Sequence, residues 1–109
     1  MFAVLYRWRI KPGLEDQFAE GWGLVTRAIR AQCGSYGARL HVADDGLHVA
    51  YARWPDALTR ENCGWSEPRG QQLMADSIGQ SFDEITMIVA VDLLDEPTES
   101  SPIRVTDRS

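Results

Sequence analysis

The sequence predicts a single α+β domain in which one antiparallel sheet packs against helices. Three observations support this fold class: an alternating apolar stretch at residues 2–10, an amphipathic stretch at residues 14–33, and two strand-like runs that meet at Asp44-Asp45-Gly46. Alternation with period 2 indicates strands, and apolar residues spaced three or four apart indicate a helix. At 109 residues the chain is long enough for one two-layer core and too short for two.

The first expected element is a strand from Phe2 to Ile10. Alternate residues form one strongly apolar face, which consists of Phe2, Val4, Tyr6, Trp8 and Ile10. The following Lys11-Pro12-Gly13 ends the strand, because proline and glycine interrupt regular structure. This apolar face must be covered by another layer.

The second element is a helix from Leu14 to about Cys33. Its apolar stripe consists of Leu14, Phe18, Trp22, Val25 and Ile29, and Gly34 is expected to end the helix. Gly21 and Gly23 flank Trp22 although glycine is unfavourable inside helices. Two explanations remain open. The preferred one is close backbone packing against the sheet, and the other is room for a ligand beside the indole of Trp22.

A β-hairpin is expected from the runs 36–42 and 47–54, because Asp-Gly between apolar runs is a strong hairpin signal. A two-residue turn at Asp45-Gly46 would pair Val42 with Val49. In that register one face gathers Arg39, His41, His48, Ala50, Ala52 and Trp54, and the other face carries Tyr51 and Arg53. A longer loop would shift the register by one residue and exchange the partners.

Two short helices and a last strand complete the domain. The helices are expected at 55–62, with Pro55 in the first turn, and from an N-cap at Ser66 to about Ile78. The strand is expected at 82–94, and it is apolar on both faces at its centre. Since the helices cover only one face of the sheet, the other face calls for a partner.

The predicted order β-α-β-β-α-α-β is that of a ferredoxin-like fold over residues 1–94. The polar residues 95–109 are expected to form a tail that is either disordered or laid over a neighbouring subunit. No internal repeat interrupts this single domain.

Charge and composition argue against several classes of partner. The net charge of −5 disfavours nucleic acid and anionic membrane surfaces. No apolar run approaches the length of about 20 residues that a membrane span needs, and a secretory signal is absent from the pattern at Met1, so the protein is expected in the cytoplasm. Cys33 and Cys63 lack the spacing of a zinc site. A disulfide between them is possible, but two idle thiols are the preferred interpretation.

Three segments of the chain resemble a known family. They are residues 6–13 (YRWRIKPG) with Glu15 and Phe18 in the following helix, residues 34–37 (GSYG) leading into Leu40-His41, and residues 49–55 (VAYARWP). In these segments, and over about residues 2–94, the chain resembles the antibiotic biosynthesis monooxygenase-like family of the dimeric α+β barrel superfamily. The resemblance implies a homodimer in which two sheets pack face to face.

The same resemblance implies a cofactor-independent monooxygenase that oxidises a small aromatic or quinol-type molecule with O2. Other members of the family degrade haem, but their first strand carries an asparagine that is absent here. We therefore expect no cofactor. The alternative function is a non-catalytic homodimer that binds a small molecule or has a structural role.

The candidate site residues follow from their chemistry. His41 and His48 have the titration range of a general base, and Tyr6 or Tyr51 would orient a substrate oxygen. Trp8, Trp22 and Trp54 are predicted walls for a planar ligand, with Trp65 as a possible fourth, and Arg53 is a candidate for an anionic group. The competing interpretation places the aromatic residues in an ordinary core and the histidines on a solvated or interface surface. Two histidines without a cluster of acids do not predict a metal site.

Overall fold

A computed structural model of the chain describes residues 1–94 and confirms the predicted α+β fold class. The helices are α1 (Glu15–Cys33), α2 (Ala57–Glu61) and α3 (Pro68–Ser77). The strands are β1 (Phe2–Ile10), β2 (Gly37–Val42), β3 (His48–Trp54), β4 (Ile78–Ser81) and β5 (Ile85–Ile88). They form one antiparallel sheet in the order β2-β3-β1-β4, with β5 also paired to β1. The predicted tail at 95–109 lies outside the described residues.

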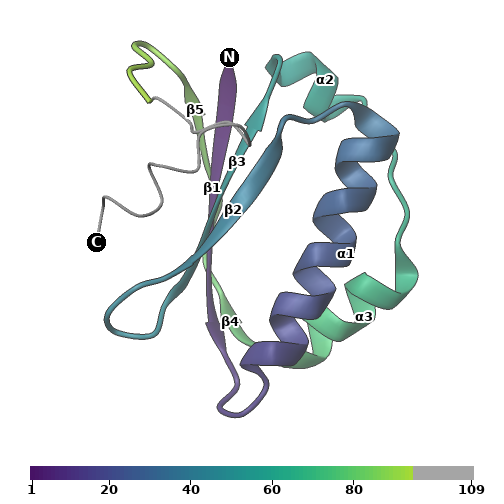
Figure 1. Ribbon diagram of the computed structural model, residues 1–109, viewed down its shortest axis with the longest axis vertical. Coiled ribbons are helices and arrows are strands. Elements are labelled where there is room, and N and C mark those ends of the chain that lie inside the picture. Colours follow the sequence, from purple (N-terminus) through teal and green to yellow (C-terminus); the bar gives the residue numbers. More distant parts are fainter. Residues whose placement is uncertain (95–109) are drawn as a thin grey trace, which may run out of the picture.

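The helices α1 and α3 lie on the same side of the sheet, so the domain has two layers (Figure 1). The core between the layers is small and includes the fully buried side chains of Val4 and Phe18. The opposite side of the sheet, which we call the open face, has no helix over it in the described part of the chain (Figure 1). Each side chain of β1 and β3 therefore either faces the helix layer or lies on the open face.

Helix α1 follows its prediction closely. It begins at Glu15 and ends at Cys33, and Gly34 takes the left-handed conformation with φ 75° while its N–H donates to the carbonyl of Arg30 at 3.1 Å. Only a residue without a Cβ adopts this conformation without strain. Of the two explanations for Gly21, packing is the one observed, but its neighbour is α3 and not the sheet. A Cβ on Gly21 would lie 2.8 Å from the carbonyl oxygen of Gly70.

The predicted hairpin exists, but its predicted register is wrong. Ala43 pairs with Leu47 across the loop Asp44-Asp45-Gly46, so that Val42 lies opposite His48 and His41 lies opposite Val49. Gly46 has φ 87°, which places the left-handed residue at the end of a three-residue loop. Because side chains alternate between faces, the one-residue shift puts His41 and His48 on opposite faces.

The C-terminal half differs from the prediction in its boundaries. α2 begins at Ala57 and not at Pro55, and Asp56 is its N-cap, with its carboxylate accepting from the N–H of Thr59 at 2.7 Å. Glu67 and not Ser66 caps α3, with its carboxylate accepting from the N–H of Gly70 at 3.1 Å.

The predicted last strand at 82–94 is shortened to β5, and β4, which was not predicted, precedes it; the two strands pair with different parts of β1. β4 lies beside the end of β1, where Trp8 pairs with Ser81, and β5 lies beside its start. The intervening Phe82 still donates its N–H to the carbonyl of Arg7 at 3.1 Å. Pairing to β1, and not alternation alone, therefore sets the limits of both strands.

The preferred interpretation of the cysteines is also wrong. Cys33 at the end of α1 and Cys63 after α2 form a disulfide, with their Cα atoms 5.3 Å apart. The two residues are 30 positions apart in the sequence, and only the packing of the segment after α2 against α1 brings them together.

Candidate functional site

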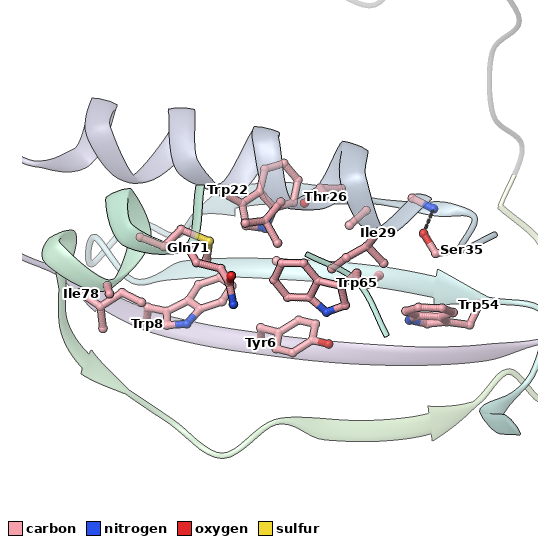
Figure 2. A pocket seen from close by; sticks show the side chains of 17 residues that line it. Tyr6, Trp8, Trp22, Thr26, Ile29, Ser35, Trp54, Trp65, Gln71 and Ile78 are labelled. Carbon is pink, nitrogen blue, oxygen red and sulfur yellow. Dashed lines mark hydrogen bonds between the residues drawn. The ribbon is translucent and has the colours of Figure 1, made fainter. Parts of the chain in front are cut away.

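A cavity of about 500 Å³ lies between the helices and the covered face of the sheet. Figure 2 shows its side chains, with α1 on one side and β1 and β3 on the other. All four tryptophans of the chain line it. The full lining consists of Tyr6, Trp8, Trp22, Val25, Thr26, Ile29, Ser35, Gly37, Ala38, Ala50, Ala52, Trp54, Trp65, Gln71, Met74, Ala75 and Ile78.

The cavity exists because small side chains face large ones. On the sheet, Ala38 lies opposite Ala52 in neighbouring strands, and Ala50 lies next to Tyr6. These alanines leave space that a leucine or valine at the same positions would fill. From the other layer, Trp22, Thr26 and Ile29 reach the space at helical spacing along α1.

Aromatic contacts fix the wall formed by β1. The rings of Tyr6 and Trp8 stack with centroids 5.8 Å apart, and Trp8 meets the buried Phe18 edge-on at 5.0 Å. Pairs of this geometry add stabilisation beyond their buried area. The wall is therefore preorganised, and it presents a flat aromatic surface to the cavity.

One polar network reaches the cavity, and it is built on the hydroxyl of Tyr6. Arg60 of α2 donates to this oxygen at 3.2 Å and to the carboxylate of Glu84 at 2.7 Å. Burial alone lowers the pKa of Arg60, but the hydrogen bonds to Glu84 and Tyr6 outweigh it and raise the pKa above its ordinary value. The guanidinium stays charged, and because it occupies a lone pair of the Tyr6 oxygen, the phenolic proton is left to donate elsewhere.

Three further polar side chains, Thr26, Ser35 and Gln71, belong to the lining. Gln71 of α3 points its amide between the aromatic side chains in Figure 2. Ser35 accepts from the N–H of Gly37 at 3.2 Å and is buried at the far end. The cavity wall is thus mainly apolar and carries a few hydroxyl and amide groups that could form hydrogen bonds with a ligand.

The predicted histidines do not line the cavity. His48 lies on the covered face but is buried against Phe18, with ring centroids 5.5 Å apart, and its Nδ1 lies 3.2 Å from the carbonyl oxygen of Gly46. His41 is exposed on the open face of β2. Their proposed role as base remains a prediction, and the expectation that they share one face is wrong.

The other predicted residues divide between the two faces. Tyr6, Trp8, Trp22 and Trp54 come together around the cavity. Tyr51 and Arg53 instead point to the open face, where both line one smaller pocket and Tyr51 also lines a second. The alternation of β3 separates the adjacent pair Arg53 and Trp54, since neighbours in a strand point to opposite faces.

Sequence reasoning missed Arg60 and Gln71. Arg60 lies in a five-residue helix, and its position in the sequence is typical of a solvent-exposed arginine. Only the folded structure brings it to the hydroxyl of Tyr6. Gln71 is a polar residue within the apolar pattern of α3, and this could have indicated a polar side chain in the cavity lining. Within residues 1–94 no group of three or more His, Cys, Asp or Glu side chains is placed to hold a metal ion. No helix in the described part of the chain is long and apolar enough to span a membrane.

Comparison with solved structures identifies the fold. No protein-family model matches the chain, and neither does any curated protein. Among solved structures, SnoaB, a cofactor-independent oxygenase from Streptomyces nogalater, matches with a TM-score of 0.69 at 12% identity, over 86% of this chain and 97% of its own.

Two further structures match over similar lengths. An antibiotic biosynthesis monooxygenase matches with a TM-score of 0.63 at 22% identity, over 84% of this chain and 100% of its own. Rv0793 from Mycobacterium tuberculosis matches with a TM-score of 0.66 at 13% identity, over 85% and 98%. The chain therefore has the ferredoxin-like α+β fold of antibiotic biosynthesis monooxygenase structures, and the resemblance expected from the sequence is confirmed at the level of the fold.

Proposed function

We propose that the cavity binds a small planar aromatic or quinol-type molecule and that the protein oxidises it with O2 without a cofactor. The observation that carries this proposal is a cavity of about 500 Å³ that four indoles line together with Tyr6, whose hydroxyl accepts a hydrogen bond from Arg60. Small-molecule sites commonly have volumes of roughly 300–1,000 Å³ and an apolar lining with a few placed polar groups. The likeness to a cofactor-independent oxygenase adds support from the fold alone.

The chemistry uses the reducing power of the substrate. A substrate with an acidic CH2 group next to an aromatic ring gives up a proton, and the resulting carbanion reduces O2. The balanced change is CH2 plus O2 to C=O plus H2O, so two C–H bonds break and one oxygen atom enters the product. The protein contributes desolvation and orientation, with the phenolic proton of Tyr6 donated to the substrate oxygen and Arg60 stabilising the charge that develops there.

The base for the first proton transfer has to come from outside the cavity lining. No histidine, carboxylate, lysine or cysteine within residues 1–94 lines the cavity. Of the predicted bases, His48 is the better candidate because its ring lies on the covered face beside Phe18. Tyr51, Arg53 and His41 would act only on a ligand at the open face.

The absence of histidine, carboxylate, lysine and cysteine from the lining within residues 1–94 favours a second candidate function, which is ligand binding without catalysis. In that case the aromatic walls and the amide of Gln71 hold the molecule and no oxygen is consumed. The two functions share the site and differ in one observable, the uptake of O2.

We also propose that the protein is a homodimer joined through its open face. The centre of this face is apolar and consists of Leu5, Val49, Tyr51, Ile85 and Met87, of which Ile85 is 41% exposed. An apolar sheet face without a helix layer is typical of an interface. Face-to-face sheet packing would cover it.

The test combines binding and turnover on the same protein. Quenching of tryptophan fluorescence measures binding of anthrone and of 1,5-dihydroxynaphthalene, and an oxygen electrode measures uptake. The proposal expects saturable quenching together with uptake, and at least a tenfold lower rate in Tyr6→Phe, which keeps the ring and removes the donor. The exposed His41→Ala variant is the control and should leave the rate unchanged.

Three outcomes separate the candidates. Binding with uptake supports the oxygenase, and binding without uptake supports the non-catalytic function. The absence of quenching with every compound of this class would overturn the proposed ligand. A rate lost in His41→Ala and kept in Tyr6→Phe would overturn the site on the covered face.

A further inference from the structure

The segment 62–67 connects α2 to α3 and carries Trp65 into the cavity wall. It begins at Asn62, the C-cap of α2, and ends at Glu67, the N-cap of α3. Within the described residues, this segment makes no backbone–backbone hydrogen bond to α1 or to the sheet. Its position against α1 therefore depends on side chains.

Two tethers hold the segment to the last turn of α1. The first is the disulfide between Cys33 and Cys63. The second is the amide of Gln32, whose Nε2 donates to the carbonyl of Ser66 at 3.0 Å and whose Oε1 accepts from the N–H of Ser66 at 3.0 Å. Trp65 lies between the two attached positions, and in Figure 2 its indole lies between Ile29 of α1 and Tyr6 of β1.

We propose that Cys33 and Cys63 form a reversible redox modification site, at which a dithiol reductant releases the Trp65 segment and opens one wall of the cavity. The release itself follows from the tethers. Its consequence for a ligand rests on the proposed function, since it requires that the cavity holds an aromatic molecule.

The reaction is an ordinary thiol–disulfide exchange. A thiolate of the reductant attacks one sulfur of the pair and displaces the other as a thiolate, which gives a mixed disulfide. The second thiol of the reductant then displaces the first cysteine. Two electrons and two protons pass to Cys33 and Cys63, which end as thiols, and the reductant ends as a disulfide.

Both cysteines are accessible to such a reagent, because each is only half-buried. After reduction the segment is held by the packing of the Trp65 indole and by the hydrogen bonds of Gln32, which are exposed and compete with water. The rest of the domain does not depend on the two sulfurs. The contact of α3 with α1 passes through Gly21 and Gly70, and the sheet is held by its own ladders.

Release of Trp65 removes one aromatic wall and admits water to the ligand. We expect the dissociation constant for a planar aromatic probe to rise about tenfold on reduction, which is the size of one lost aromatic contact. The sheet walls formed by Tyr6, Trp8 and Trp54 stay in place. Binding is therefore weakened and not abolished.

Hydrogen exchange on the full-length protein tests the release. We compare the oxidised protein, the protein in dithiothreitol, and the double variant Cys33→Ser/Cys63→Ser. The expected result is at least tenfold faster amide exchange at 62–67 after reduction, with β1 and β3 unchanged, and the same fast exchange in the double variant with or without dithiothreitol. Gln32→Ala in the oxidised protein is the matched control, because it removes the other tether and should change exchange less.

Binding of 1,5-dihydroxynaphthalene, measured by tryptophan quenching in the same samples, tests the consequence. Unchanged exchange on reduction, two free thiols in air-equilibrated protein, or faster exchange across the whole sheet would each overturn the redox site. A probe that binds equally in both states overturns the opening of the cavity but leaves the proposed function intact. A probe that binds in neither state, with exchange at 62–67 still responding, overturns the proposed ligand and supports the redox site.

Discussion

The two faces of the sheet carry different kinds of residue, although the same strands supply both. On β1, Val4, Tyr6 and Trp8 point to the helices, whereas Leu5, Arg7 and Arg9 point to the open face. The covered face combines aromatic residues with alanines and contains a cavity. The open face has an apolar centre with arginines towards its ends.

This difference shows that alternation alone does not mark a site. Both faces contain tyrosine, histidine and apolar residues, so the sequence pattern does not indicate which face carries a binding site. What distinguishes them is the second layer, because α1 and α3 enclose space over one face only. The following predictions test how far the two faces differ, beginning with the largest expected effect.

Substitutions in the core beneath the cavity should lower the stability of the isolated domain strongly, and substitutions on the open face should lower it much less. Phe18→Ala removes a fully buried ring that contacts Trp8 and His48, and we expect a loss of about 3–5 kcal/mol in the free energy of unfolding. Tyr51→Ala on the open face should cost clearly less at protein concentrations where the chain is monomeric. Urea denaturation of both variants measures this, and equal losses would contradict the comparison.

The open face should instead control association. Leu5→Asp places a charge at the apolar centre, between Tyr51 and Ile85 on the neighbouring strands. An unpaired charge buried in an interface costs several kcal/mol, so the dimer dissociation constant should rise at least about a hundredfold. Light scattering after size exclusion gives the mass of each form. A wild-type monomer at high concentration would remove the basis of the proposed dimer.

The covered layer also depends on the close approach of α1 and α3. A Cβ on Gly70 would lie 2.9 Å from the carbonyl oxygen of Gly21, so Gly70→Ala should cost about 1–3 kcal/mol through overpacking. Gly64→Ala is the matched control, because nothing lies within 4 Å of its Cβ position. Thermal unfolding of the two variants compares them. A larger loss in Gly64→Ala would contradict the packing described for this pair.

The cavity should be removable without unfolding the protein. Ala52→Leu adds side-chain volume to the covered face inside the cavity, and we expect at least a tenfold weaker binding of 1,5-dihydroxynaphthalene. Ala31→Leu, at an exposed position of α1, is the control and should bind as the wild type does. Fluorescence titration provides the measurement. Unchanged affinity in Ala52→Leu would place the ligand elsewhere.

The smallest expected effect concerns the hairpin loop. The N–H of Leu47 and then the guanidinium of Arg9 hold the pKa of Asp45 below its ordinary value of 3.8. Since the folded-state pKa is lower than the unfolded one, this stabilisation is complete above pH 3.8 and is lost as the pH falls through the folded value. Thermal unfolding of wild type and Asp45→Asn should therefore differ most above pH 4 and converge in acid. A difference that is independent of pH would exclude the carboxylate as its source.

Part of the fold could be predicted from local sequence signals. The alternation of Phe2–Ile10 and the stripe of α1 gave both elements with correct or nearly correct ends, because a strand ended by Pro-Gly and a helix ended by glycine need no distant contact. Four of the predicted site residues, Tyr6, Trp8, Trp22 and Trp54, also meet at one cavity. Their roles there stay predictions.

The register of the hairpin, the hydrogen-bond partner of Tyr6 and the disulfide depend instead on how the two layers pack. The loop at Asp44-Asp45-Gly46 is compatible with two registers, and Arg9 contacts the observed one by donating to the carbonyl and the carboxylate of Asp45, each at 2.9 Å. Arg9 lies 36 positions away in the sequence, Arg60 lies 54 positions from Tyr6, and Cys33 lies 30 from Cys63. Contacts over such separations leave no periodic or adjacent pattern in the sequence, because they form only after the layers have packed.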